Sequence, residues 1–277
     1  MPLVPNHAKR RMQKGGLALG FGVHHLRGAA VPLLTAATGH DWVFVDMEHG
    51  ATSVHDATQI CLAALGAGVT PIVRCCHDAL DEGTRALDNG ALGVIVPHVD
   101  TAKQAKRVAQ AFRYPPAGHR SWGGPPAAYG FAPPPVKEAQ KALNDELLIT
   151  VMIETPEAVE NAAEIAEVEG VDALMIGTSD LSAEMGVPGE MGHKRVQAAY
   201  EQVAKACRKS GKILGMGGVY DEVWAKAYIG LGAQFVLTGS DHNFLMSAGS
   251  ARTKLLRGFE AAPPKVPKPG RKAAKAA

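Results

Sequence analysis

The stretch that indicates the fold most directly is WVFVDMEHG, residues 42–50. Residues 42–45 are apolar and of types that favour β-strands, and Asp46, Glu48 and His49 follow within four positions. The pattern predicts a buried strand whose C-terminal end carries polar side chains. In α/β folds with parallel strands, ligands bind at that end of the strands. The same arrangement recurs elsewhere in the chain.

Seven further apolar runs alternate with segments of helical periodicity. The predicted strands are residues 17–23, 42–47, 71–75, 92–97, 148–154, 171–177, 212–217 and 233–239. Parallel strands need crossover helices, and eight such units close into a TIM (β/α)8 barrel. An open doubly wound sheet is the alternative, but it usually has a glycine-rich phosphate loop after its first strand. The first turn here, residues 20–28, has no GxGxxG motif, so the barrel is favoured.

The pattern also predicts the domain boundaries. We expect an N-terminal extension over residues 1–13, the barrel over residues 14–258, and a disordered tail rich in Pro, Lys and Ala over residues 259–277. An extra C-terminal helix, from about residue 241 to residue 257, ends the barrel segment. Residues 114–135 hold seven prolines and four glycines and predict a long loop. Residues 178–192 are expected to form a second loop.

Composition excludes several classes of protein. A net charge of +2 gives no reason to expect nucleic acid as a partner. The sequence has no run of 18 uncharged apolar residues and no secretory signal pattern, so we expect no membrane span and a cytoplasmic location. Its four cysteines include no CxxC pair, which argues against a zinc ribbon and favours buried thiols.

Two isolated carboxylates, Glu154 and Asp180, follow adjacent predicted strands. They could coordinate one divalent cation, and oxygen ligands of this kind suit Mg²⁺ or Mn²⁺ better than zinc. Two protein ligands would leave open coordination positions, as a catalytic metal requires. The alternative is that both carboxylates only cap the segments that follow them, and the residue types alone leave both interpretations open.

Three more polar residues end predicted strands. Arg74 ends a strand that is otherwise apolar, so its burial requires either an anionic ligand or a structural salt bridge. Asp46 and His49 lie three residues apart at a strand-to-loop bend, where an aspartate can set the tautomer of a histidine and raise its basicity. Structural histidines are equally compatible with this spacing. No predicted strand ends in lysine, which argues against a Schiff-base aldolase.

Several motifs occur together in one order. They are VDMEHG (45–50), PIVR (71–74), LDNGALGVIVPHV (87–99), RYPPAGHR (113–120), IET (153–155) and GTSDLSAEMG (177–186). Together they resemble the HpcH/HpaI aldolase family, which comprises metal-dependent class II pyruvate aldolases on a TIM barrel. The similarity extends from about residue 14 to about residue 258. Each motif alone is weak, but the combination is specific.

The resemblance implies a role for each matching position. Glu154 and Asp180 would hold a divalent metal, Mg²⁺ or Mn²⁺, with Co²⁺ also possible. Backbone groups of Gly177, Thr178 and Ser179 would hold the carboxylate of a 2-oxo acid, which would chelate the metal.

Four other positions are assigned catalytic roles by the same resemblance. Arg74 would stabilise the enolate oxygen, and His49, oriented by Asp46, would move protons. Asp88 would act in the site of a neighbouring subunit, or else be an exposed carboxylate at a helix end. Family members assemble as hexamers, trimers of dimers that exchange the last helix, so a homo-oligomer is expected. Many members have a glutamine where this chain has Met152, which affects the pocket wall.

These residues favour a divalent-metal-dependent aldolase. It would cleave 4-hydroxy-2-oxo acids reversibly to pyruvate or hydroxypyruvate and an aldehyde through a metal-bound enolate. A related lyase acting on acyl-CoA esters, as in the citrate lyase β-like relatives, is the first alternative. A non-catalytic binder of oxo acids is the second, although a binder has no need of a proton-transfer group.

Overall fold

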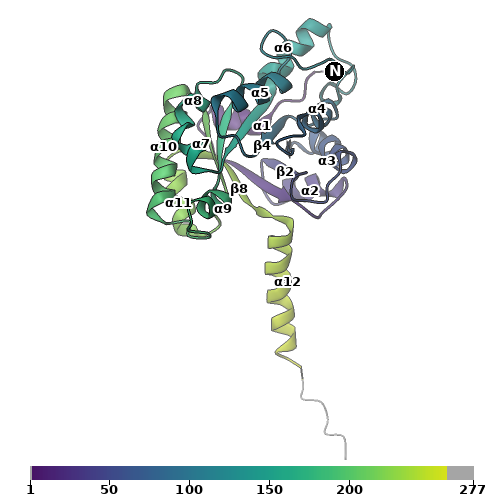
Figure 1. Ribbon diagram of the computed structural model, residues 1–277. Helices are drawn as coiled ribbons and strands as arrows, with labels where there is room; N and C mark the ends of the chain where they lie inside the picture. Colours follow the sequence, from purple (N-terminus) through teal and green to yellow (C-terminus); the bar gives the residue numbers. More distant parts are fainter. Residues whose placement is uncertain (1, 261–277) are drawn as a thin grey trace, which may run out of the picture. The chain divides into compact units, whose positions relative to one another are not determined.

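The computed structural model describes residues 2–260 (Figure 1). Eight parallel strands form a closed barrel in chain order, which confirms the predicted TIM barrel. The strands are β1 (Ala18–Val23), β2 (Trp42–Asp46), β3 (Thr70–Arg74), β4 (Gly93–Val96), β5 (Leu148–Ile153), β6 (Ala173–Gly177), β7 (Ile213–Gly217) and β8 (Ala233–Ser240).

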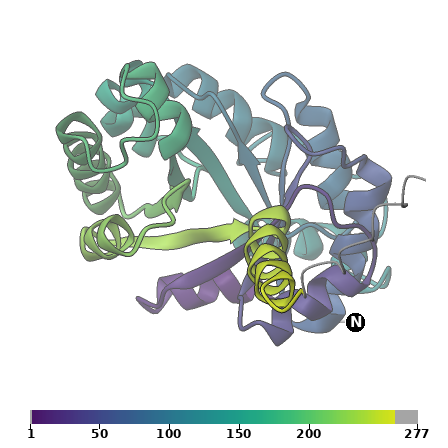
Figure 2. The ribbon, with the colours of Figure 1, turned by 90° about the horizontal axis from the view of Figure 1, so that it is seen from below.

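Helices surround the barrel and follow one another around it in chain order (Figure 2). Those between the strands are α2 (Ala30–Ala37), α3 (Val54–Ala67), α4 (Leu80–Asp88), α5 (Ala102–Phe112), α6 (Val136–Glu146), α7 (Pro156–Glu160), α8 (Ala162–Ala166), α9 (Thr178–Glu184), α10 (Lys194–Ser210) and α11 (Glu222–Gly230). Local signals set several of their ends. Ser53 with Asp56 forms a capping box at the start of α3, and Gly211 ends α10 with a positive φ of 64°.

The long segment at residues 114–135 is a loop, as expected, apart from the short 3₁₀ helix η1 (Ala127–Tyr129). The expectation of a second loop over residues 178–192 is wrong in its first half, because α9 begins directly after β6. Thr, Ser and Asp occur both in turns and at helix starts, so the residue types at positions 178–180 did not distinguish a loop from the first turn of a helix.

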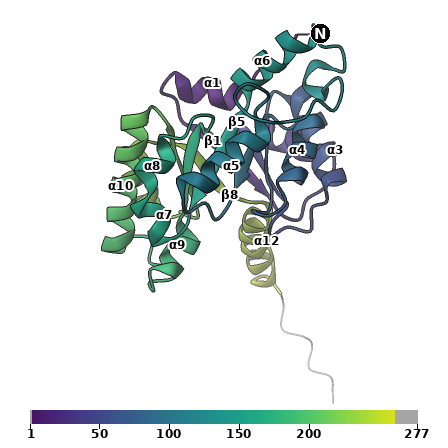
Figure 3. The same ribbon diagram turned by 45° about the horizontal axis from the view of Figure 1, so that its top comes forward.

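An unexpected helix, α1 (His7–Gln13), lies within the predicted N-terminal extension. Its Ala8 and Met12 are buried with the side chains that fill the inside of the barrel. Figure 3 shows α1 at the same end of the barrel as α6, and the Lys9 ammonium donates to the carbonyls of Asp145 and Leu147 at the C-terminal end of that helix. This helix therefore closes the end of the barrel opposite the strand C-termini.

The inside of the barrel is filled by large side chains. Trp42 and Phe235 stack with their ring centroids 4.1 Å apart. Gly20 allows this, because a Cβ at that position would lie only 2.7 Å from Trp42 Cδ2. Full burial of a large apolar side chain contributes roughly 1.5–3 kcal/mol to stability. A second, larger apolar layer lies between the strands and the surrounding helices.

The chain divides into two compact units, residues 1–242 and residues 243–277. Helix α12 (Asp241–Arg257) begins at the end of the first unit and makes up most of the described part of the second. Most of the predicted tail, residues 261–277, lies outside the described residues. Within residues 2–260, no helix is both long enough and apolar enough to cross a lipid bilayer.

Candidate active site

A cavity of about 270 Å³ opens among the C-terminal ends of the strands. Such an opening is the usual place for the active site of a TIM barrel. Its lining includes six of the predicted site residues, which are His49, Arg74, Gly177, Thr178, Ser179 and Asp180. His24, Phe44, Met152, Met175, Gly217, Gly218, Tyr220 and Leu237 complete the lining.

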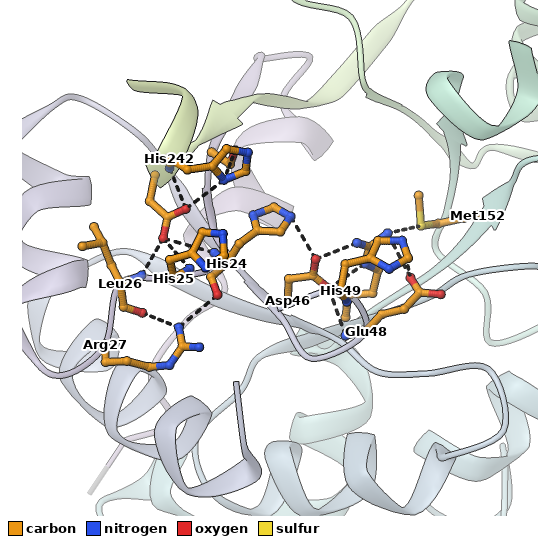
Figure 4. A network of polar contacts seen from close by, with 12 residues as sticks. His24, His25, Leu26, Arg27, Asp46, Glu48, His49, Met152 and His242 are labelled. Atoms are coloured by element: carbon orange, nitrogen blue, oxygen red, sulfur yellow. Dashed lines mark hydrogen bonds and ion pairs between the residues drawn. The ribbon is translucent and has the colours of Figure 1, made fainter. Parts of the chain in front are cut away.

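Asp46 is the centre of a buried ionic network (Figure 4). Its side chain is 0% exposed. It accepts hydrogen bonds from Arg74 Nε at 2.9 Å and Arg74 Nη2 at 2.7 Å, and His24 Nε2 lies 2.9 Å from its Oδ2. Burial would raise the pKa of the Asp46 carboxyl, but the hydrogen bonds from His24 and Arg74 outweigh burial and hold the pKa well below its usual value. Asp46 is therefore an anion that fixes two cavity side chains.

The expected pairing of Asp46 with the His49 ring is wrong. From His49, Asp46 Oδ1 accepts the backbone N–H, at 3.3 Å, and not the ring; the same oxygen accepts the backbone N–H of Glu48, at 3.0 Å. The His49 side chain is 60% exposed, and its Nε2 lies 3.8 Å from Glu48 Oε2. The bend after β2 turns the His49 ring outward to the cavity, while register with β1 brings His24 beside Asp46 (Figure 4).

Arg74 has a second acidic neighbour. Its Nη1 lies 3.0 Å from Glu48 Oε2, and its guanidinium carbon lies 5.1 Å from the centre of the Phe44 ring. Burial alone would lower the pKa of Arg74, but the carboxylates of Asp46 and Glu48 raise it above its ordinary value. Arg74 is therefore a permanent cation at the cavity wall. The sequence left open whether an anionic ligand or a salt bridge accounts for its burial, and the structure shows a salt bridge to Asp46 and Glu48.

Glu154 is 2% exposed and packs against Gly177, which lines the cavity. Its Oε2 accepts the backbone N–H of His98 at 2.8 Å. Burial is the main reason that the pKa of Glu154 is raised to about 7. The nearby negative charge of Asp180 also raises this pKa, whereas the hydrogen bond from the His98 N–H and the charges of His98 and Arg74 lower it. The buried carboxylate of Glu154 and the exposed carboxylate of Asp180 match the donor set of an oxygen-bound divalent cation, which would relieve their repulsion and the desolvation of Glu154.

The segment from Gly177 to Asp180 shapes the other wall. Position 177 requires glycine, because a Cβ there would lie only 2.7 Å from Glu154 Cγ. The Thr178 hydroxyl turns away from the cavity and donates to the carbonyl of Gly217 at 2.7 Å. Only backbone groups of this segment, with Ser179, are therefore available to a ligand carboxylate.

Asp88 lies apart from this cluster. It is the last residue of α4, and its Oδ1 accepts a 2.6 Å hydrogen bond from Arg120 in the Pro/Gly-rich loop. Arg120 is nearly fully buried and its guanidinium lies over the Tyr114 ring at 4.6 Å. Within one chain, Asp88 therefore helps to anchor this loop.

Comparison with known proteins decides the family. Residues 29–248 match the model of the HpcH/HpaI aldolase/citrate lyase family. The chain belongs to this family. The 4-hydroxy-4-methyl-2-oxoglutarate aldolase cghB of Chaetomium globosum is 36% identical over 247 residues, covering 88% of this chain and 92% of that protein. The 2-keto-3-deoxy-L-rhamnonate aldolase of Escherichia coli K12 is 33% identical over 242 residues, covering 86% and 88%.

A solved structure supports the same assignment. The HpcH/HpaI aldolase from Desulfitobacterium hafniense DCB-2 superimposes with a TM-score of 0.83 at 28% identity, covering 94% of this chain and 98% of that one. These relatives confirm the expectation of an enzyme, a carbon–carbon lyase of the aldolase type. No lysine lines the cavity among the described residues.

Sequence reasoning gave no role to three residues of this HpcH/HpaI site. Glu48 bridges Arg74 and His98, since its Oε1 lies 3.5 Å from His98 Nε2. His98 has a positive φ of 53°, which points its backbone N–H at Glu154. His24 bonds Asp46. All three follow predicted strand ends, and that position was the available signal.

Proposed function

We propose that this aldolase cleaves small 4-hydroxy-2-oxo acids reversibly, giving pyruvate or hydroxypyruvate and a carbonyl product. The observation that carries the proposal is a cavity lined by the Arg74 cation and the Asp180 carboxylate, with the buried Glu154 carboxylate packed against Gly177 of the same lining. A volume of about 270 Å³ is at the lower end of ligand pockets and suits a small acid. The relatives named as aldolases of 2-oxo acids support this substrate class.

Glu154 and Asp180 would hold a divalent cation, Mg²⁺ or Mn²⁺ by the oxygen character of its ligands. Bound there, the cation would act as a Lewis acid on the 2-oxo group of the substrate. The raised pKa of Glu154, caused by burial with the added charge of Asp180, is the feature that fits a cation. Glu154 would then be held ionised.

Arg74 would stabilise the negative charge that develops on the substrate oxygen when the carbon–carbon bond breaks. Its two acidic partners, Asp46 and Glu48, fix the guanidinium before substrate binds, so no reorganisation is needed at that moment. Met152 Sδ lies 4.0 Å from Arg74 Nη1, where many family members would have a glutamine. A thioether donates no hydrogen bond, so the wall beside Arg74 is more apolar here and would favour a less polar part of the substrate.

His49 would move the proton between substrate and solvent. Its ring lines the cavity and is mostly exposed, so exchange with water is fast from this position. Asp46 would serve this reaction by positioning Arg74 rather than by orienting His49. The substrate carboxylate would lie against the backbone of residues 177–179, with Ser179 beside it.

We also propose a cytoplasmic homo-oligomer, a hexamer built as a trimer of dimers, in which Asp88 reaches the site of a neighbouring subunit. Four free cysteines agree with a reducing compartment. Light scattering on a size-exclusion column would give the mass, and a monomer would remove the role of Asp88 in a second subunit. Arg120 already neutralises Asp88 within its own chain, so such a role requires Arg120 to move or to be shared.

The decisive experiment follows the C3 hydrogens of pyruvate and hydroxypyruvate in D₂O by proton NMR, with Mg²⁺ and again with EDTA. We expect exchange that requires the metal, and pyruvate release from 4-hydroxy-4-methyl-2-oxoglutarate in a coupled assay. Asp180→Asn should abolish both, whereas Asp78→Asn, at a side chain that is 91% exposed, should change neither. Absence of exchange together with cleavage of an acyl-CoA ester would favour the acyl-CoA lyase. Metal binding without any turnover would favour the binder.

A further inference from the structure

A cluster of three histidines lies beside the proposed catalytic residues and has no role in the reaction described above. His24 and His25 follow β1, and His242 follows β8 (Figure 4). The centre of the His242 ring lies 5.2 Å from that of His24 and 5.4 Å from that of His25. Asp241 lies among them and is fully buried.

His24 is prepared as a ligand. Its Nε2 lies 2.9 Å from Asp46 Oδ2, which places the ring proton on that nitrogen because the Asp46 carboxylate can only accept. Its Nδ1 is then an acceptor, and this atom is buried without a hydrogen-bond partner. A histidine that donates one ring N–H to a carboxylate and offers the other nitrogen is the usual form of a metal-bound histidine.

Asp241 provides a fixed oxygen next to it. Its Oδ2 accepts the backbone N–H groups of His25 at 2.7 Å and Leu26 at 2.6 Å, with that of His24 at 3.2 Å. Its Oδ1 accepts the N–H of His242, at 2.8 Å, which occupies one of its two lone pairs and leaves capacity for a cation. The carboxylate is thereby held toward the histidine rings.

His242 completes the set. Its Nδ1 lies 3.4 Å from Asp241 Oδ1, and its side chain is 44% exposed, so the ring can rotate. It would have to give up a contact of 3.2 Å with Ser240 Oγ. One ligand atom each from His24, Asp241 and His242 lie within 4.8 Å of one another. Tetrahedral Zn²⁺ with bonds of about 2.0–2.2 Å has ligand atoms about 3.4 Å apart, so the three atoms would have to move closer together on binding, and the partly exposed His242 ring is free to do so.

We propose that His24, Asp241 and His242 form a second metal site, selective for an imidazole-preferring cation such as Zn²⁺. The two imidazoles distinguish it from the all-oxygen pair Glu154 and Asp180, which suits Mg²⁺. Three protein ligands leave one position for water or for His25. A cation on His24 Nδ1 locks the tautomer that donates to Asp46, and Asp46 holds Arg74. Occupancy of this site therefore stabilises the arrangement of the Arg74 guanidinium.

Isothermal titration of the full chain with Zn²⁺, in a large excess of Mg²⁺, tests this site without measuring activity. We expect one Zn²⁺ per chain. His242→Asn should weaken binding by at least about 10–100-fold, the scale seen when even an outer partner of a metal ligand is lost. His24→Asn should do the same, and His55→Asn, at an exposed histidine of α3, should leave Zn²⁺ affinity unchanged.

Two results would overturn the proposal. One is the absence of a Zn²⁺ isotherm in the unaltered protein. The other is Zn²⁺ binding that survives in His242→Asn but disappears in Glu154→Gln, because Zn²⁺ would then be competing for the oxygen site. Circular dichroism of each variant confirms that it is folded, and His242→Asn is the more informative change because its side chain is partly exposed.

Discussion

Gly177→Ala is the substitution whose effect follows most directly from the structure. Gly177 ends β6 with a φ of −83°, so alanine is compatible with its backbone. A Cβ there would lie 2.7 Å from Glu154 Cγ and 3.0 Å from Cδ, and closer still to Oε1, whereas ordinary contacts begin at 3.4 Å. The Glu154 side chain must therefore move by about 0.7 Å or more, and it is buried on all sides.

A shift of this size matters because Glu154 would hold the metal. Misplacement of a catalytic group by about 1 Å can cost roughly 10²-fold in rate. We expect Gly177→Ala to weaken Mn²⁺ binding by at least tenfold and to lower kcat/KM by about 10²-fold. Overpacking of this kind also costs about 1–3 kcal/mol of stability, so the melting temperature should fall without loss of the fold.

Gly217→Ala is the matched control. Gly217 is the register partner of Gly177 on β7, and it also lines the cavity. A Cβ there would meet Met175 Cε at 3.6 Å and the carbonyl of Ile176 at 3.7 Å, which are ordinary contacts. Mn²⁺ affinity, measured by titration calorimetry without substrate, should be near normal in this variant. Equal Mn²⁺ affinity in Gly177→Ala and the unaltered protein would refute the assignment of Glu154 as a metal ligand.

Three other predictions concern the same site. Arg74→Ala should lower kcat by about 10²–10³-fold, the cost of losing one charge-stabilising donor, and steady-state kinetics showing an unchanged kcat would remove Arg74 from the mechanism. EDTA should abolish aldol cleavage and added Mg²⁺ should restore it, whereas activity retained in EDTA would contradict a class II mechanism. Hydrogen bonds from His24 and Arg74 outweigh burial and lower the pKa of Asp46 in the folded protein. The ionised carboxylate therefore stabilises the fold fully above the unfolded pKa of about 4, and this contribution to stability is lost as the pH falls below that value. The difference in melting temperature between the unaltered protein and Asp46→Asn should therefore shrink between pH 7 and pH 3, and a constant difference would contradict the assigned charge state.

The sequence predicted the barrel because strand and helix periodicities alternate eight times, and a closed parallel sheet is the fold that this count favours. It also identified the polar residues that follow the strands, including Arg74, Glu154 and Asp180. Helix α9 was missed, since its first turn is made of Thr178, Ser179 and Asp180, which are as common in loops as at helix starts.

Which of those polar residues touch one another was decided only by tertiary structure. His49 follows Asp46 on the same strand, whereas His24 follows the preceding strand. The ring that contacts Asp46 is nevertheless that of His24. Parallel pairing of Val23 with Val45 brings the residues that follow each strand together. These strands are almost continuous apolar runs buried on both faces, so they lack the alternation that would specify their register. The approach of Asp241 to His24, across 217 residues, depends in the same way on closure of β8 against β1. The amino-acid pattern thus determined the fold and the side of the barrel that carries the chemistry, and barrel closure determined the partners within it.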